Sequence, residues 1–198
     1  MRHPLMIATL VVLLPLTLAA GTAHGGSTRV HAPLECTKGS SDAHLDVSVT
    51  VPGSAAPGAT FTVRIDGASS GAISQVGLNY LHDSVTDYII PTGTTYVEGS
   101  AALVPDTGTE NVRAGAGVIY RGGLVRLTLP GKVENGASYT PPSIEFKVVV
   151  AAPAGESLVL GFSQYRLMVN AVVIGDLKVT CNPKPRPFPL ATIRVVAP

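Results

Sequence analysis

Two places in the sequence carry residue types that catalyse hydrolysis, but neither has the spacing that catalysis needs. His82, Asp83 and Ser84 are the three residue types of a serine-hydrolase triad. Consecutive strand residues point to opposite faces, so these neighbours cannot form a relay among themselves, and we expect a loop between strands. Ser163 lies in Gly161–Tyr165, which matches the Gly-x-Ser-x-Gly elbow only in part, and we expect it in a hairpin turn. The sequence therefore predicts no catalytic residues and a protein that is not an enzyme.

Histidines and acidic residues are the next candidates, because they bind metal ions. Beyond the first 25 residues the histidines are His31, His44 and His82, which are scattered and form no His-x-His or Cys/His motif. We therefore expect no zinc site. The segment Asp106–Asn111 offers oxygen ligands for calcium, but it lacks the spaced acids and final Glu of a calcium-binding loop, so it is interpreted as a solvated loop. The sequence predicts no metal and no cofactor.

Aromatic residues would be needed for a glycan-binding face. The chain has no Trp, and its sugar-stacking candidates are tyrosines. Tyrosine also serves as a half-buried strand residue, so we expect packing in the core or at its rim. The tyrosines in question are Tyr88, Tyr96, Tyr120, Tyr139 and Tyr165.

Two further kinds of site are not expected. Lys147 is in an apolar strand pattern, where some bacterial surface sandwiches form a Lys to Asn isopeptide bond, but Phe146 and Val148 occupy the inward positions and leave Lys147 outward. The glycines of Gly115–Gly117 lack the Lys of a phosphate-binding loop and predict a turn or bulge instead.

The two cysteines are Cys36 and Cys181, near opposite ends of the chain that follows the leader. In an oxidising compartment such a pair predicts a structural disulfide, and two free thiols or an intermolecular bond are the alternatives. Closing so long a loop stabilises a fold by about 5 kcal/mol in the chain-entropy model. The two cysteines do not form a Cys-x-x-Cys motif, so we expect no redox role for them.

The first residues have the pattern of an export signal. Arg2 and His3 precede an uncharged apolar run from Leu5 to Ala20, and small residues follow it. This predicts a secretory signal peptide over residues 1–25, cut after Ala23 or Gly25, with a membrane anchor as the alternative. We expect no later membrane span, and a secreted, extracellular or cell-envelope location.

Charge also excludes some partners. The whole chain has 14 Lys and Arg against 13 Asp and Glu, and loss of Arg2 with the leader makes the two equal. A surface of this kind has no electrostatic footprint for nucleic acid. The expected partner is an unidentified protein, glycan or lipid of the cell envelope.

Alternating apolar and polar residues predict strands throughout the chain, with turn signals at intervals of about ten residues. The clearest example is the predicted strand at 45–51, whose apolar face consists of Leu45, Val47, Val49 and Val51. We expect a single all-β domain over residues 26–182, an immunoglobulin-like antiparallel β-sandwich, with a closed barrel as the alternative. The expected strands lie at 45–51, 61–65, 73–81, 85–90, 94–103, 112–120, 124–129, 144–150, 157–162, 165–181 with a turn at 175–176, and 192–196.

The tail, residues 183–198, is predicted to be a Pro-rich spacer followed by a strand. Alternate prolines over Asn182–Pro189 cannot donate ladder hydrogen bonds, which predicts stiff polyproline II. The strand after it is expected to pair within its own domain rather than with a partner's sheet.

One stretch resembles a known family. Asp87–Val97 has the pattern D-x-x-x-P-x-G-x-x-[FY]-V, which is similar to the core of a family of bacterial cell-surface repeat domains of unknown function. That resemblance covers about half of the chain and implies an immunoglobulin-like sandwich, although this chain has one copy and no tandem repeats. The endings Val179–Pro183 and Ala191–Ile193 are also similar to uncharacterised secreted proteins of actinobacteria.

These observations predict a non-catalytic secreted or envelope-associated protein that acts by binding or adhesion. The alternative is a carrier that holds a lipid or sterol between its sheets, suggested by the apolar region Leu158–Ile174. A hydrolase would need His82 to meet an acid and a hydroxyl from other strands.

Overall fold

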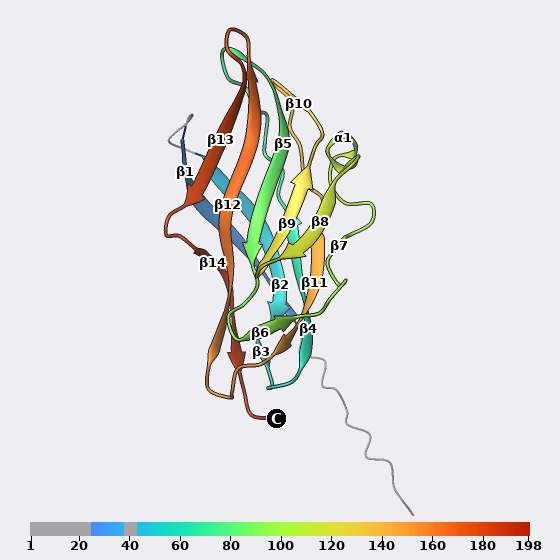
Figure 1. Ribbon diagram of the computed structural model, residues 1–198, viewed down its shortest axis with the longest axis vertical. Coiled ribbons are helices and arrows are strands. Elements are labelled where there is room, and N and C mark those ends of the chain that lie inside the picture. Colours follow the sequence, from blue (N-terminus) through green and yellow to red (C-terminus); the bar gives the residue numbers. More distant parts are fainter. Residues whose placement is uncertain (1–24, 38–42) are drawn as a thin grey trace, which may run out of the picture.

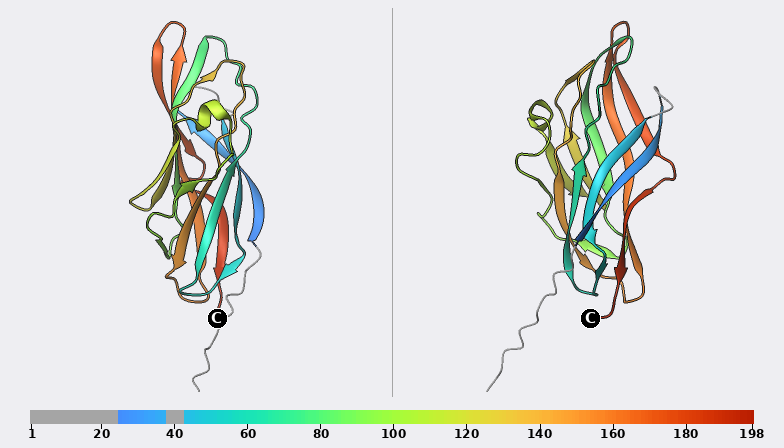
Figure 2. Two further views of the ribbon diagram at one scale, coloured as in Figure 1. Left: turned by 90° about the vertical axis from the view of Figure 1, so that its right-hand side faces the viewer. Right: turned by 180° about the vertical axis from the view of Figure 1, so that it is seen from behind.

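The computed structural model describes residues 25–37 and 43–198, which form an elongated sandwich of two β-layers (Figures 1 and 2). The first layer contains β1 (Gly25–Cys36), β2 (His44–Pro52), β4 (Thr60–Gly67), β11 (Ile144–Val150), β6 (Thr94–Tyr96) and β7 (Ala102–Leu103). The second contains β13 (Gly175–Pro183), β12 (Ser157–Ala171), β5 (Leu78–Ile89), β9 (Leu124–Leu129), β8 (Gly117–Arg121), β10 (Val133–Glu134), β14 (Phe188–Val195) and β3 (Ser54–Ala55). The all-β, immunoglobulin-like antiparallel sandwich is thereby confirmed; β14 and β3 form a parallel pair at one edge.

The core lies between the layers because each strand alternates inward apolar and outward polar residues. In β11, for example, Phe146 and Val148 are fully buried whereas Lys147 between them is exposed, as the sequence predicts. The largest fully buried side chains come from both layers: Phe146, Phe162, Ile65, Ile144, Leu158, Leu160 and Ile193.

Strand β1 belongs to both layers. Residues Gly25 to Pro33 pair with β2, and Leu34 to Cys36 pair with β13 in the other layer. Cys36 lies directly opposite Cys181, and the two form the predicted disulfide. The bond therefore lies within the second layer, where it fastens the end of β1 that has crossed from the first layer to β13.

The Pro-rich tail is not an extended spacer. β13 and β14 both run antiparallel to β12 along its same edge, with β13 opposite Tyr165–Ala171 and β14 opposite Ser157–Phe162. Residues 184–187 lie between β13 and β14 and do not pair with β12. They form an outward loop that connects these two strands (Figure 1). Prolines lack the N–H that the ladder needs, so the chain bulges there and then resumes pairing within its own domain.

Other boundaries differ from the predicted ones. The separate strands expected at 73–81 and 85–90 are one strand, β5, and the expected break after 162 lies inside β12. The stretch at 112–120 begins instead with a short helix, α1 (Glu110–Arg113). The predicted signal peptide, except Gly25, lies outside the described residues. None of the helical residues in the described ranges forms a membrane-spanning segment.

Candidate functional site

Four aliphatic side chains are exposed together at one end of the sandwich, in what we call the aliphatic tip: Val76, Val172, Val173 and Ile174. Residues 172–174 form the turn between β12 and β13 at the top of Figure 1, and Val76 is in the loop that leads into β5. Val76 and Val173 are almost fully exposed, and Val172 and Ile174 are about two-thirds exposed. Val76 falls within the strand predicted at 73–81, but the strand in the structure begins only at Leu78.

Hydrogen bonds hold the two parts of the tip together. The backbone N–H of Val172 donates to the carbonyl of Gly77 at 2.9 Å. Below it, the Asn79 amide donates to Asn170 at 2.8 Å, and the Asn170 amide donates to Asp176 Oδ1 at 2.6 Å. These bonds link β5, β12 and β13, so the tip has a polar brace directly beneath it.

His82 completes this polar brace. Its ring lies between two carboxylates, with Nδ1 2.9 Å from Asp83 Oδ2 and Nε2 3.3 Å from Asp176 Oδ1. The hydrogen bond from Asn170, and then the one from His82, hold the pKa of Asp176 below its usual value. Asp176 is therefore ionised and able to accept both bonds at neutral pH.

The predicted positions of His82 and Ser163 are both wrong. His82, Asp83 and Ser84 lie within β5 rather than in a loop, and Asp83 has a positive φ of 47° beside an irregularity in the pairing with β12. Ser163 lies within β12, at another such irregularity, rather than in a turn. Among the described residues, the side-chain partners of the His82 ring are carboxylates and not a hydroxyl.

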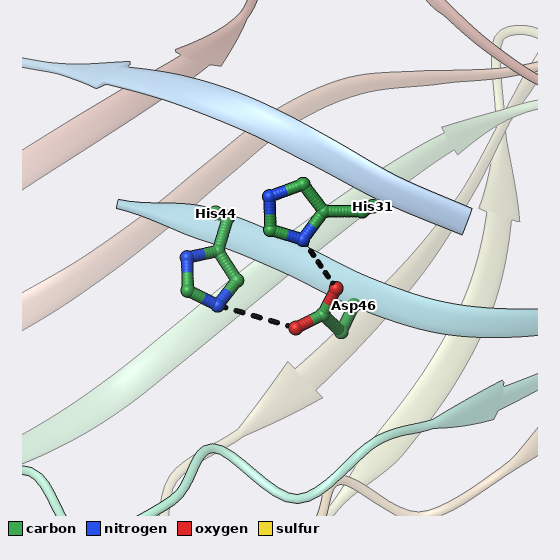
Figure 3. A group of neighbouring side chains, drawn as sticks. All are labelled: His31, His44 and Asp46. Atoms are coloured by element: carbon green, nitrogen blue, oxygen red, sulfur yellow. Dashed lines mark hydrogen bonds and ion pairs between the residues drawn. The ribbon is translucent and has the colours of Figure 1, made fainter. Parts of the chain in front are cut away.

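Two histidines that the sequence analysis considered scattered lie side by side on the outer face of the first layer (Figure 3). His31 in β1 is directly opposite Asp46 in β2, and His44 precedes Asp46 by two residues on the same face. His31 Nδ1 is 2.7 Å from Asp46 Oδ1, and His44 Nε2 is 3.2 Å from Asp46 Oδ2. The premise against a metal site, that the histidines are dispersed, therefore does not hold for His31 and His44.

The tyrosines do not form a sugar-binding platform. Tyr88 is buried in the core, and the hydroxyls of Tyr139 and Tyr165 lie 3.1 Å apart in the interior. Burial raises the pKa of Tyr139 and Tyr165, so both stay neutral. The stacked rings of Tyr96 and Tyr120, 3.9 Å apart, join the edges of the two layers. The prediction of core or rim packing is confirmed.

A small cavity lies between the layers beside these tyrosines. Its volume is about 70 Å³, and its lining includes Thr86, Tyr88, Leu127, Tyr139 and Tyr165. Pockets for drug-sized ligands occupy about 300–1,000 Å³. The geometry therefore does not favour the alternative in which a lipid or sterol lies between the sheets.

Asp87 is a buried carboxylate on the outer face of the second layer, and the sequence pattern did not predict its ion pairs. Asp87 in β5 accepts from Arg126 Nε at 2.7 Å and Nη2 at 3.1 Å, and from Arg166 Nη2 at 3.0 Å. The three side chains come from the neighbouring strands β5, β9 and β12. The pairing satisfies the charge and ties three strands together, which indicates a structural role.

The side chains of the segment Asp106–Asn111, which was considered as a calcium-binding loop, contact other parts of the protein. Asp106 is 3.4 Å from Arg113, Thr109 accepts from the backbone of Thr140, and the Asn111 amide donates to the carbonyl of Lys132. These side chains fasten the loop and α1 to neighbouring segments instead of converging on one point.

Comparison with protein-family models found no matching family, and comparison with curated proteins found no match. The solved structures that are similar to this chain include three of low identity. A putative membrane-anchored protein from Corynebacterium diphtheriae matches with 13% identity and a TM-score of 0.44 over 88% of this chain, which spans only 38% of that protein. The collagen-binding domain of a Staphylococcus aureus adhesin has 10% identity and a TM-score of 0.34, over 68% of this chain and 87% of that one. A cohesin module from a Clostridium perfringens family 33 glycoside hydrolase has 14% identity and a TM-score of 0.34, over 89% and 100%. At such TM-scores these similarities carry no conclusion about activity.

Proposed function

We propose that this chain is a non-catalytic binding protein of the cell exterior or envelope, which inserts its aliphatic tip into an apolar recess on a partner protein. The observation that carries the proposal is the exposure of Val76, Val172, Val173 and Ile174 at one end of the molecule.

Exposed aliphatic side chains favour association because their burial releases water. Full burial of a Val or Ile side chain is worth about 1.5–3 kcal/mol. Single exposed apolar residues are ordinary, but a contiguous group at a protruding end marks an interaction surface. The tip groups four such side chains, whereas Ile119 and Val159 are exposed on separate strands elsewhere.

The polar brace makes the tip a preorganised contact. Bonds through Asn79, Asn170 and Asp176 fix the hairpin against β5 before any partner arrives. A fixed shape loses little conformational entropy on binding, which suits a recess of complementary shape. This supports a protein partner over a fluid lipid surface.

Charge and aromatic content support the same choice. In the described part of the chain, the charged side chains near the brace include Asp83 and Asp176 as well as Lys132, so they do not form a basic cluster that would favour anionic lipid. The buried or stacked tyrosines offer no platform for stacking sugars. An apolar recess of a protein is the occupant that fits what the tip presents.

The disulfide supports the location. Cys36 and Cys181 are bonded, and disulfides of this kind persist in oxidising compartments outside the cytoplasm.

Site-specific crosslinking tests the proposal. A photo-crosslinking amino acid replaces Val173 in cells that make the protein naturally, and the same amino acid at Ile119 serves as the control, because Ile119 is also an exposed aliphatic residue. We expect one defined protein adduct from position 173, competed by excess wild-type chain but not by a V173S/I174S chain. Equal adducts from both positions, or adducts with lipid alone, would overturn the proposal.

A further inference from the structure

We propose that His31, His44 and Asp46 form a binding site for a divalent late transition-metal ion such as Zn²⁺. The site lies on the outer face of the first layer and shares no residue with the aliphatic tip, so it is independent of the proposed function.

The ligand types fit such an ion. Two imidazole nitrogens and one carboxylate oxygen are a donor set that Zn²⁺ and its neighbours in the first transition row accept, whereas Mg²⁺ and Ca²⁺ prefer oxygen donors alone. The chain offers both imidazoles and the carboxylate on one patch of surface (Figure 3).

The sheet places the three donors in advance. His31 and Asp46 are a directly opposed cross-strand pair, and His44 and Asp46 are two residues apart on one strand. Both relations put side chains on the same face of a sheet, within reach of one another. The backbone ladder of β1 and β2 fixes these relations, so the ion would not need to order a loop.

The distances need only small side-chain rotations. One donor atom from each residue lies within 4.8 Å of the other two, and the two contacts to Asp46 are 2.7 and 3.2 Å. Zn–N and Zn–O bonds of about 2.0–2.2 Å in tetrahedral geometry set donors about 3.3 Å apart. The separations of the donors therefore bracket the spacing that a bound ion would set, and side-chain rotation would bring the three donors to it.

The two histidines are partly exposed, which determines how an ion reaches the site and how it is coordinated there. The side chains of His31 and His44 are 63% and 46% exposed. An ion can reach them directly, and, since the described residues supply three ligands, its fourth position is open to water. Among the described residues the site therefore differs from closed structural zinc sites, which have four protein ligands.

The third described histidine supplies a matched control. His82 also contacts carboxylates, Asp83 and Asp176, but it has no second imidazole in reach among the described residues. If a histidine beside an acid were sufficient for binding, His82→Ala would matter as much as His31→Ala.

The test is calorimetric titration of the full chain, made without a histidine tag, with ZnCl₂ and separately with MgCl₂. We expect one Zn²⁺ per chain, no heat from Mg²⁺, at least tenfold weaker binding in H31A/H44A and in D46A, and unchanged binding in H82A. Zinc at 100 times its Kd should raise the Tm of the wild type by about 5 °C and leave that of H31A/H44A unchanged. No Zn²⁺ binding at millimolar concentration, or equal loss in H82A, would overturn the site.

A second measurement uses the wild-type chain alone, so its result does not depend on whether a variant folds. In the wild-type chain, NMR of the imidazole resonances during zinc titration should show saturable shifts for His31 and His44 and none for His82. Shifts of all three in parallel would indicate non-specific coordination and contradict the proposal.

Discussion

Asp87 shows how one residue can organise a sheet face. Its side chain is only 6% exposed, although it points away from the core, because Arg126 and Arg166 cover it. A buried charge is tolerated when it is paired and hydrogen-bonded, and both oxygens of Asp87 accept from arginines. The carboxylate is thus the central contact that links β9, β5 and β12 on their outer face.

Replacing Asp87 with Asn should destabilise the fold by about 2 kcal/mol, because it leaves two partly exposed arginines without their counter-charge. Asp106→Asn is the matched control, since Asp106 is almost fully exposed and its arginine contact is long. Urea unfolding of the two variants measures the difference. Equal stability of the two would show that Asp87 has no such role.

The roles of Asp87 and of the His31–His44–Asp46 cluster could not be predicted from local sequence. Arg126 and Arg166 lie 39 and 79 residues from Asp87, and His31 lies 15 residues from Asp46 on a neighbouring strand. Only the pairing register of the strands brings these groups together, and register is set by the whole sheet rather than by a short motif.

At the scale of elements, the hairpin of β12 and β13 with the start of β5 forms the part that presents the aliphatic tip. Its brace depends on Asn170, which donates to Asp176 and accepts from Asn79. The brace converts an exposed turn into a fixed projection.

Asn170→Ala should loosen the tip without unfolding the sandwich. Loss of a hydrogen bond worth about 1 kcal/mol predicts roughly fivefold faster hydrogen exchange at the Val172 amide, which bonds to Gly77. Residue-resolved exchange measures it, with the core strand β11 as the internal reference. Unchanged exchange at Val172 would mean that the brace does not hold the tip.

The Asp176 contacts also predict a pH dependence. The pKa of Asp176 is lowered in the folded state, first by the Asn170 bond and then by His82. A depressed folded pKa gives a contribution that is present above the unfolded pKa of about 3.9 and is lost as pH falls through the folded value. The stability advantage of the wild type over D176N should therefore shrink as pH falls from 5 to 2. An advantage that is constant or grows in urea titrations over that range would contradict the assignment.

Alternation was enough to predict much of the sandwich. The predicted strands at 124–129 and 144–150 have the same bounds as β9 and β11, because their inward residues are uniformly apolar. The pattern failed where apolar residues are exposed: Val172, Val173 and Ile174 resemble strand core in sequence but form a turn. It also missed β1, where His31 and Pro33 alternate with buried Val30 and Ala32.

At the scale of the whole molecule, β1 connects the two layers, and the disulfide fixes the end of β1 to β13. Cys36 and Cys181 are 145 residues apart in sequence and join the strand that crosses the layers to β13. In the chain-entropy model a loop of this length stabilises the folded state by about 5 kcal/mol.

Removing both sulfurs in C36A/C181A should therefore lower the free energy of unfolding by several kcal/mol while the sandwich remains folded at low temperature. Denaturant unfolding of the oxidised wild type, the reduced wild type and the double variant measures this, and the last two should agree. If reduction leaves the unfolding midpoint unchanged, the disulfide does not stabilise the molecule as a whole.

The central claim is that the aliphatic tip is the contact surface. Its most direct test is co-sedimentation of purified wild-type, V173S/I174S and I119S chains with envelope fractions of the native cells, over a range of concentrations. Even if burial in the recess is partial and each of the two side chains contributes only about 1 kcal/mol, V173S/I174S should bind at least tenfold more weakly, whereas I119S should bind as the wild type does. Equal binding by all three chains would contradict the account.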